Sequence, residues 1–184
     1  MNQIIIPSLV IVGLLLFFIS LFNKLRKTDI SATEALSQID VQLKRRADLI
    51  PNLVETVKGY AAHESGTLLK VTEARSATLR ATTFEDRVSS DGALTGALRG
   101  LLAISENYPD LKASANFLAL QEELSTTENK ISFARQYYND SVSKLNSLVS
   151  TIPTNMFSGI AGVKVREFYR VENENDLKLP DVKF

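Results

Sequence analysis

The amino-acid sequence predicts an all-α fold in which one N-terminal transmembrane helix is followed by a bundle of long helices. An uncharged apolar run extends from Ile4 to Phe22. After it, apolar residues recur at steps of three and four, the period of a helix that buries one face. Only five prolines and eight glycines interrupt the 184 residues, and strong helix formers dominate the rest. This balance favours long helices over a sheet.

The apolar run predicts a transmembrane helix at residues 4–23. Helical residues rise about 1.5 Å each, so a run of this length nearly crosses a hydrocarbon core of roughly 30 Å. The alternative is a cleaved signal peptide, which would need a basic start and small residues at a cleavage site. Met1–Gln3 carries no basic side chain, and Ser20–Asn23 offers no such site. An uncleaved anchor is therefore the preferred interpretation.

Charges next to the run predict its orientation. Lys24, Arg26 and Lys27 follow it, whereas residues 1–3 contribute only the α-amino group. Positively charged flanks stay on the cytoplasmic side of a membrane. The sequence thus predicts a single-pass membrane protein with a short extracytoplasmic N-terminus and a cytoplasmic body.

The apolar spacing then predicts four helices, at residues 31–62, 64–81, 93–105 and 109–150. Pro51 lies inside the first of them and is expected to kink it. The polar run Thr82–Gly92 lacks helical spacing and is expected to be a mobile loop. Residues 24–153 form the predicted helical domain, and residues 154–184 are expected to form a helical turn and a weakly structured tail.

Charged residues interrupt two of the apolar stripes. Arg46 lies in the stripe of the first helix, and Glu128 and Arg135 lie in that of the longest helix. A buried charge without a partner costs several kcal/mol, so we expect an ion-pair network that joins the helices, with Arg46 paired to Glu128 or Glu122. The alternative is a polar groove that binds a ligand or a charged segment of a partner.

Other residues bear on assembly and chemistry. Leu49 and Leu53 belong to an apolar arc wider than one neighbouring helix covers, which predicts a further helix from the same or another chain and favours a homo-oligomer. Tyr60 ends the apolar stripe of the first helix, which also contains Arg46. The single histidine, His63, is followed by Glu64 and suits a helix-terminal hydrogen bond or, alternatively, a ligand or proton-transfer role. The sequence has no cysteine, no Ser-His-Asp order, no Gly-rich phosphate loop and no HExxH motif, so we expect no catalytic, metal or cofactor site.

Three stretches together closely resemble the LemA family. They are IDVQLKRRADLIPNLVETVKGYAAHE (39–64), ENYPDLKAS (106–114) and FLALQEELSTTENKISFARQYYN (117–139), and the closing PDVKF (180–184) is also similar. The resemblance implies a transmembrane N-terminus with a short outer tail and a LemA-like antiparallel helical bundle in the cytoplasm. It also implies a location in the bacterial inner membrane, and it implies no reaction.

Two functions remain open on this basis. The first is a non-catalytic scaffold that self-assembles, recruits proteins at the membrane, or does both. The second is an envelope-stress or signalling adaptor that regulates a membrane enzyme such as a protease, with the Arg46 region as its docking site. Lipid contacts the N-terminal helix in either case. Nucleic acid is not expected as a partner, because the 21 basic and 21 acidic residues balance.

Overall fold

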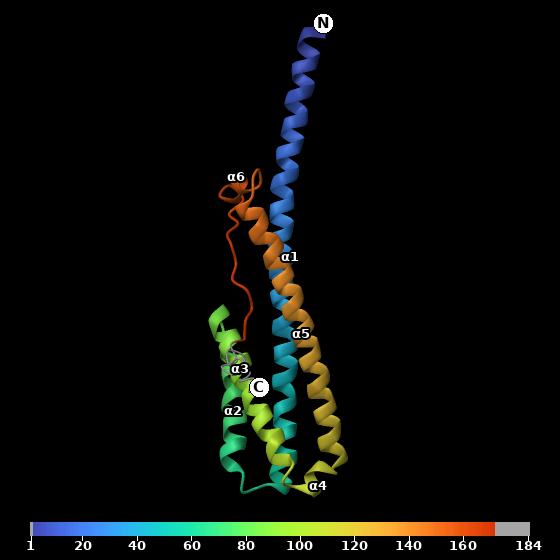
Figure 1. Ribbon diagram of the computed structural model, residues 1–184, viewed down its shortest axis with the longest axis vertical. Coiled ribbons are helices and arrows are strands. Elements are labelled where there is room, and N and C mark those ends of the chain that lie inside the picture. Colours follow the sequence, from blue (N-terminus) through green and yellow to red (C-terminus); the bar gives the residue numbers. More distant parts are fainter. Residues whose placement is uncertain (1, 172–184) are drawn as a thin grey trace, which may run out of the picture. The chain divides into compact units, whose positions relative to one another are not determined.

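The computed structural model describes residues 2–171, with side chains from Ile5 onward. Every element of regular secondary structure in this part of the chain is a helix, which confirms the all-α prediction (Figure 1). The helices are α1 (Asn2–Tyr60), α2 (Ser65–Arg80), α3 (Phe84–Ser105), α4 (Pro109–Lys112), α5 (Ala115–Ser150) and α6 (Asn155–Ser158).

Helix α1 is continuous from the apolar run into the helical body. The separate helix start predicted at residue 31 is wrong, because nothing between Lys24 and Ile30 breaks a helix. The helix also continues through Pro51. Its N-terminal part is long and apolar enough to cross a membrane, and the side chains of residues 5–20 are exposed. An apolar surface of this kind suits contact with lipid rather than water.

Helix α3 begins nine residues before the predicted start at Ala93, so the expected mobile loop at residues 82–92 is wrong over most of its length. A capping box starts the helix. The Thr83 hydroxyl accepts a hydrogen bond from the Asp86 backbone N–H at 3.1 Å, and the Asp86 carboxylate accepts one from the Thr83 N–H at 3.4 Å. These two bonds satisfy donors that the first turn of a helix leaves free.

The longest predicted helix is divided in two. Pro109 occupies the first turn of α4, where its missing N–H costs little, and Leu111 of that turn is buried. The chain leaves the helix at Ala113 and Ser114, and α5 then runs from Ala115. Both interrupting residues are tolerated in helices, so burial of Leu111 and Phe117 rather than local propensity decides the break.

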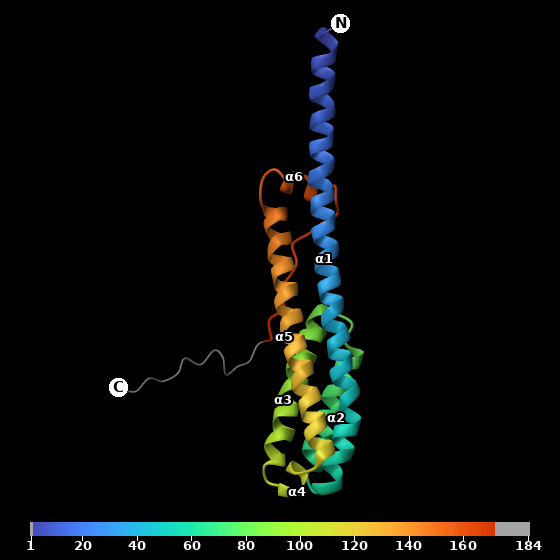
Figure 2. The same ribbon diagram turned by 90° about the vertical axis from the view of Figure 1, so that its right-hand side faces the viewer.

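The fold divides into two units, of which the first comprises Ile39–Phe133 and the described residues from Tyr169 onward. In this unit consecutive helices α1, α2 and α3 reverse direction at short turns (Figure 2). Its core is a cluster of apolar side chains from α1 to α5: Ile50, Leu53, Val57, Ala61, Leu68, Val71, Leu94, Leu98, Leu101, Leu111, Phe117 and Leu124. Leu49 and Val54 pack against the cluster, so helices of the same chain cover the wide apolar arc of α1.

The second unit comprises Met1–Gln38 and Ala134–Phe168. Its buried apolar side chains come from α1, α5 and the chain after α6: Leu25, Ala32, Ala35, Ala134, Tyr138, Val142, Leu145, Ala161 and Val163. From Val163 to Val171 the chain has no regular secondary structure. The remainder of the predicted tail, with the PDVKF end, lies outside the described residues.

The capping box of α3 generates a stability prediction. Thr83→Ala removes the side-chain acceptor and should lower the free energy of unfolding by about 1 kcal/mol, as loss of an N-cap does in other helices. The free energy can be measured by urea titration of the full chain in detergent, followed by circular dichroism. Thr82→Ala is the matched control and should change it by less than about 0.5 kcal/mol. Equal values for the two variants would contradict a capping role.

Candidate functional site around Arg46

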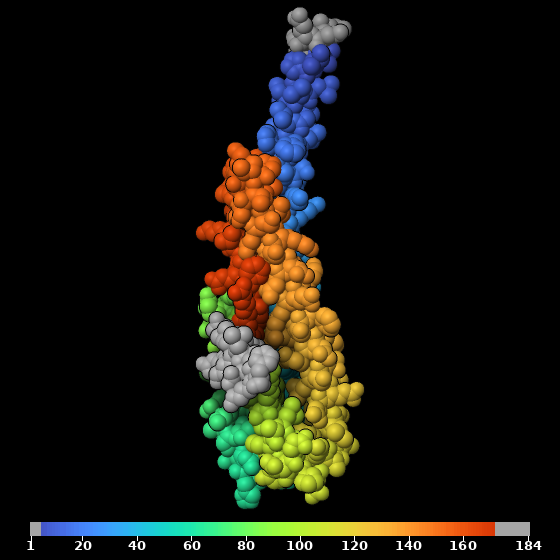
Figure 3. Space-filling model, viewed as in Figure 1, coloured from blue at the N-terminus to red at the C-terminus, as the bar shows by residue number. Residues whose placement is uncertain are grey.

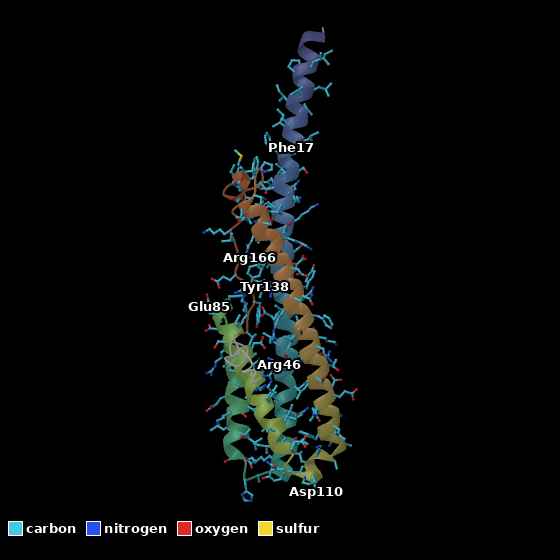
Figure 4. All side chains as sticks on the ribbon, in the orientation of Figure 1. Phe17, Arg46, Glu85, Asp110, Tyr138 and Arg166 are labelled. Carbon is cyan, nitrogen blue, oxygen red and sulfur yellow. The ribbon has the colours of Figure 1, made fainter. Side chains whose placement is uncertain are left out.

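Arg46 is the largest side chain that the fold buries completely. It lies on the apolar stripe of α1 between Leu43 and Ile50, and 1% of its surface is exposed. Figure 4 labels it among the helices of the bundle, away from either end of α1. A guanidinium keeps its charge at any physiological pH, so this position requires compensating acceptors from neighbouring helices.

Two carboxylates and a hydroxyl supply those acceptors. The Arg46 Nη1 group donates to the Glu128 carboxylate of α5 at 2.5 Å and to the Thr95 hydroxyl of α3 at 3.0 Å. Nη2 donates to the Asp91 carboxylate and, at 3.4 Å, to the Asp91 backbone carbonyl. All four hydrogens on the two Nη atoms therefore have acceptors. Glu128 and Glu122 were the two carboxylates expected as partners of Arg46. Glu128 bonds to Arg46, whereas Glu122 is exposed on α5.

Tyr169 extends this network to the chain beyond α6. Its hydroxyl donates to the Asp91 carboxylate at 2.8 Å, on the oxygen that Arg46 does not use. The Tyr169 ring lies edge-on to Phe84, with centroids 5.7 Å apart. Gly92 allows a close approach here, because a Cβ on it would lie 3.2 Å from a methyl of Val171. The Arg46 network thus contains groups from α1, α3, α5 and the non-helical segment.

The two carboxylates of the network differ in their solvation. Asp91 is fully buried, whereas 42% of the Glu128 side chain is exposed. Water can therefore solvate Glu128 if Arg46 is lost, but it cannot reach Asp91 without a rearrangement of the helices. Most of the stability that is lost when Arg46 is removed should therefore come from Asp91, whose buried charge would have no cation beside it.

A pocket of about 350 Å³ opens beside the network, between α3 and α5. Its lining is mainly apolar with amide, hydroxyl and charged groups at the rim: Arg46, Thr95, Leu98, Arg99, Leu102, Gln121, Leu124, Ser125, Glu128 and Asn129. The Arg46 guanidinium is already bonded within the protein, and Arg99 is exposed. The pocket can accept an apolar group. Its hydroxyl groups, on Thr95 and Ser125, share the lining with the Glu128 carboxylate, which is paired with Arg46.

The burial of Arg46 limits the docking site that the adaptor hypothesis places in its region, which stays a prediction. A partner's charged segment cannot reach a side chain that is 1% exposed and bonded on both Nη atoms. The neighbouring Arg45 is on the surface instead, where it pairs with Glu123 at 3.0 Å.

The other predicted site residues differ in their burial. Leu53 is in the core and Leu49 is at its edge. Arg135 is partly buried on α5, whereas His63 is exposed in the turn after α1. Tyr60 is also exposed, at 48%, because the buried stripe passes from Val57 to Ala61, which is 1% exposed. Within residues that the structure describes, no three His, Cys, Asp or Glu side chains are placed to hold a metal ion.

A second ion pair joins α1 to α3 near the surface. Arg87 Nε lies 3.0 Å from the Asp40 carboxylate, and 41% of the Asp40 side chain is exposed. Partial burial raises the pKa of Asp40 above its ordinary value of 3.8, and the charge of Arg87 opposes that rise. This pair lies on the same face of α3 as Asp91, one turn earlier.

Sequence reasoning missed Asp91 and Tyr169. Asp91 was placed in a loop, yet Leu94, Leu98 and Leu101 continue backward at steps of three and four to Asp91. Extending the stripe would have found it. Tyr169 carries no comparable signal, because its segment has no regular period and the contact spans 78 positions.

Comparison with known proteins confirms the family resemblance. Residues 35–184 match the model of the LemA family. Protein LemA of Metamycoplasma hominis is 30% identical over 134 residues, which cover 72% of this chain and 61% of that protein. Magnetosome protein MamQ 2 of Paramagnetospirillum magneticum and Magnetosome protein MamQ of Magnetospirillum gryphiswaldense are 23% and 22% identical over 166 residues, 76% of this chain. The matches span 61% of the length of each relative.

The Arg46 network generates a second prediction. Arg46→Met keeps the volume but strands the buried Asp91 carboxylate, so it should lower the free energy of unfolding by roughly 3 kcal/mol or more. The matched control is Arg45→Met, which breaks an exposed pair and should cost less than about 0.5 kcal/mol. Both values come from urea titration of the full chain in detergent. If the two variants lost the same stability, the buried-charge interpretation of Arg46 would be refuted.

Proposed function

This chain is a membrane-associated member of the LemA family, and from that we propose that it is a non-catalytic helical scaffold anchored in the bacterial inner membrane. In this proposal copies of the chain assemble with one another and can recruit further proteins at the cytoplasmic face. The observation that carries it is α1, a single helix that includes both the apolar stretch and the central stripe of the bundle core. The apolar stretch and the core stripe therefore belong to one continuous helix.

The structure's polar residues support a non-catalytic role. The most deeply buried charges, on Arg46 and Asp91, are bonded to each other. Groups that stabilise a fold in this way are not available to bind a substrate.

An exposed stripe on α5 supports self-assembly. Its residues follow each other at steps of three and four along one face: Leu118, Glu122, Thr126, Asn129, Phe133 and Tyr137. Phe133 is 72% exposed and Tyr137 is 50% exposed, and a spacing of four places them side by side. Exposed aromatic pairs are typical anchors of protein interfaces. Confinement to a membrane also raises the effective concentration of copies, so even a small contact can assemble them.

The adaptor function remains the second candidate. A protein that regulates a membrane enzyme such as a protease needs a surface for it, and the exposed α5 stripe offers one in place of the buried Arg46. Purification from membranes in mild detergent separates the two functions. A uniform homo-assembly favours the scaffold, whereas a foreign partner in less than equal amount favours the adaptor.

The proposed topology is tested with a single cysteine, since the chain has none. Ser89 is exposed on α3, whereas its neighbour Ser90 is buried, so Ser89→Cys is the suitable reporter. An impermeant thiol reagent should leave it unlabelled in intact cells and label it after permeabilisation. Asn2→Cys is the control and should be labelled in intact cells. Labelling of the cysteine at position 89 in intact cells would overturn the cytoplasmic placement.

The proposed assembly is tested on α5. Phe133→Ala with Tyr137→Ala should weaken self-association of the detergent-extracted protein roughly tenfold or more, because interface aromatics commonly contribute over 1 kcal/mol each. Analytical ultracentrifugation over a range of concentrations measures this. Leu69→Ala, which truncates an exposed apolar residue on α2, should leave association unchanged. A monomer at all concentrations for the unmodified chain would refute self-assembly.

A further inference from the structure

The turn around α6 exposes an unusual amount of apolar surface. Ile152, Met156 and Ile160 are 82%, 71% and 77% exposed, within a stretch of chain that has no charged residue from Leu145 to Val163. An isolated exposed apolar side chain is ordinary, but several large ones on one short turn indicate a surface that contacts something other than water.

This turn lies against α1 at the end of its apolar run. The rings of Phe157 and Phe18 have centroids 5.3 Å apart. Phe18 is four residues before the end of the run at Phe22, which corresponds to about 6 Å along the helix axis. Further along, Arg26 donates to the Ala161 carbonyl at 3.4 Å. Figures 1 and 2 both show α6 beside α1, and Figure 3 shows the apolar part of α1 continuing uncovered beyond it.

Internal hydrogen bonds fix the shape of the turn. The Thr154 hydroxyl contacts the Leu148 carbonyl at 2.5 Å and the Thr151 carbonyl at 3.0 Å. After α6, Gly162 adopts a φ of +65°, a conformation that favours glycine, and the Val163 N–H donates to the Ser158 carbonyl at 2.9 Å. The exposed apolar side chains are thus held in place by a defined backbone.

Charges around the turn point to lipid as the occupant of this surface. No acidic residue occurs in residues 1–28 or 141–166. Lys24 and Lys27 follow the apolar run, Lys164 follows the turn, and all three are exposed. Apolar side chains edged by cations match the boundary between acyl chains and anionic headgroups.

We propose that residues 152–160 form a second membrane contact, in which the α6 turn inserts Ile152, Met156 and Ile160 into the leaflet from which α1 emerges. This inference rests on the membrane anchorage of α1 within the proposed function. The contact with α1 places the turn at the depth that interfacial insertion requires, about 5–10 Å into the boundary region. A second copy of the chain or another protein has no such depth relation to the apolar run.

The absence of tryptophan from the sequence provides a direct test. Met156→Trp places a single indole on the turn of the full chain, reconstituted in phosphatidylcholine and phosphatidylglycerol vesicles. Leu69→Trp is the matched control, at an exposed apolar site on α2. Lipids brominated near the headgroup end of the acyl chain should quench about half or more of the position-156 emission, as expected for an interfacial depth. They should leave the control emission unchanged. Circular dichroism checks the fold, and Ile160→Trp replaces Met156→Trp if that variant misfolds.

Flotation of the vesicles separates the possible failures. Protein that floats with the vesicles but shows no quenching on the turn would overturn this inference and leave the anchorage of α1 standing. Equal quenching at positions 156 and 69 would also overturn it. Shielding of the indole that appears only at high protein density would do the same, because it indicates a second copy. Protein that does not float would overturn the anchorage and this inference with it.

Discussion

The buried positive charge of Arg46 is the constraint on which the arrangement of its helices depends. It cannot be left without acceptors, and Asp91, Thr95 and Glu128 reach it only when α3 and α5 present those faces to α1. Rotating either helix by one residue would separate the charges. Asp91 would then be a buried carboxylate with neither a cation nor water beside it. Apolar residues of equal volume can match such a network in stability, so its effect is better described as selection of one helix register.

Side-chain hydrogen bonds also hold the non-helical segment after α6 within the unit that comprises residues 1–38 and 134–168. The Asn146 amide pairs with the Arg166 backbone in both directions, at 2.9 Å for each hydrogen bond. The Arg166 guanidinium contacts Asp29 at 2.7 Å and Thr33 at 2.8 Å. Tyr138 donates to the Glu167 carbonyl at 3.0 Å, and burial raises the pKa of this phenol above its ordinary value. Backbone groups of Arg166 and Glu167 that lack a helix or sheet are thus satisfied by side chains of α5, and α1 binds the Arg166 side chain.

The sequence predicted what depends on helical period and missed what depends on long-range contacts. Apolar spacing located most of α1, α2 and α5, and it placed Arg46 and Glu128 on facing stripes. The start of α3 was missed because its capping box uses Asp86 where Glu or Gln is usual, and Asp91 was lost with it. The break before α5 and the position of Tyr169 depend on tertiary contacts of Leu111 and of the buried Asp91, which no local pattern encodes.

The net charge of the chain is near zero, but its basic and acidic residues are unevenly distributed along the sequence. Residues 1–28 and 141–166 contain six of the 21 basic residues and none of the acidic ones. The rest of the chain is consequently acidic overall. An anionic leaflet attracts the first group and repels the second over about a Debye length, roughly 8–10 Å at ordinary ionic strength. In the proposed topology, the charges that orient α1 therefore also favour contact of the α6 turn with headgroups, because Lys24, Lys27 and Lys164 lie in the regions that lack carboxylates.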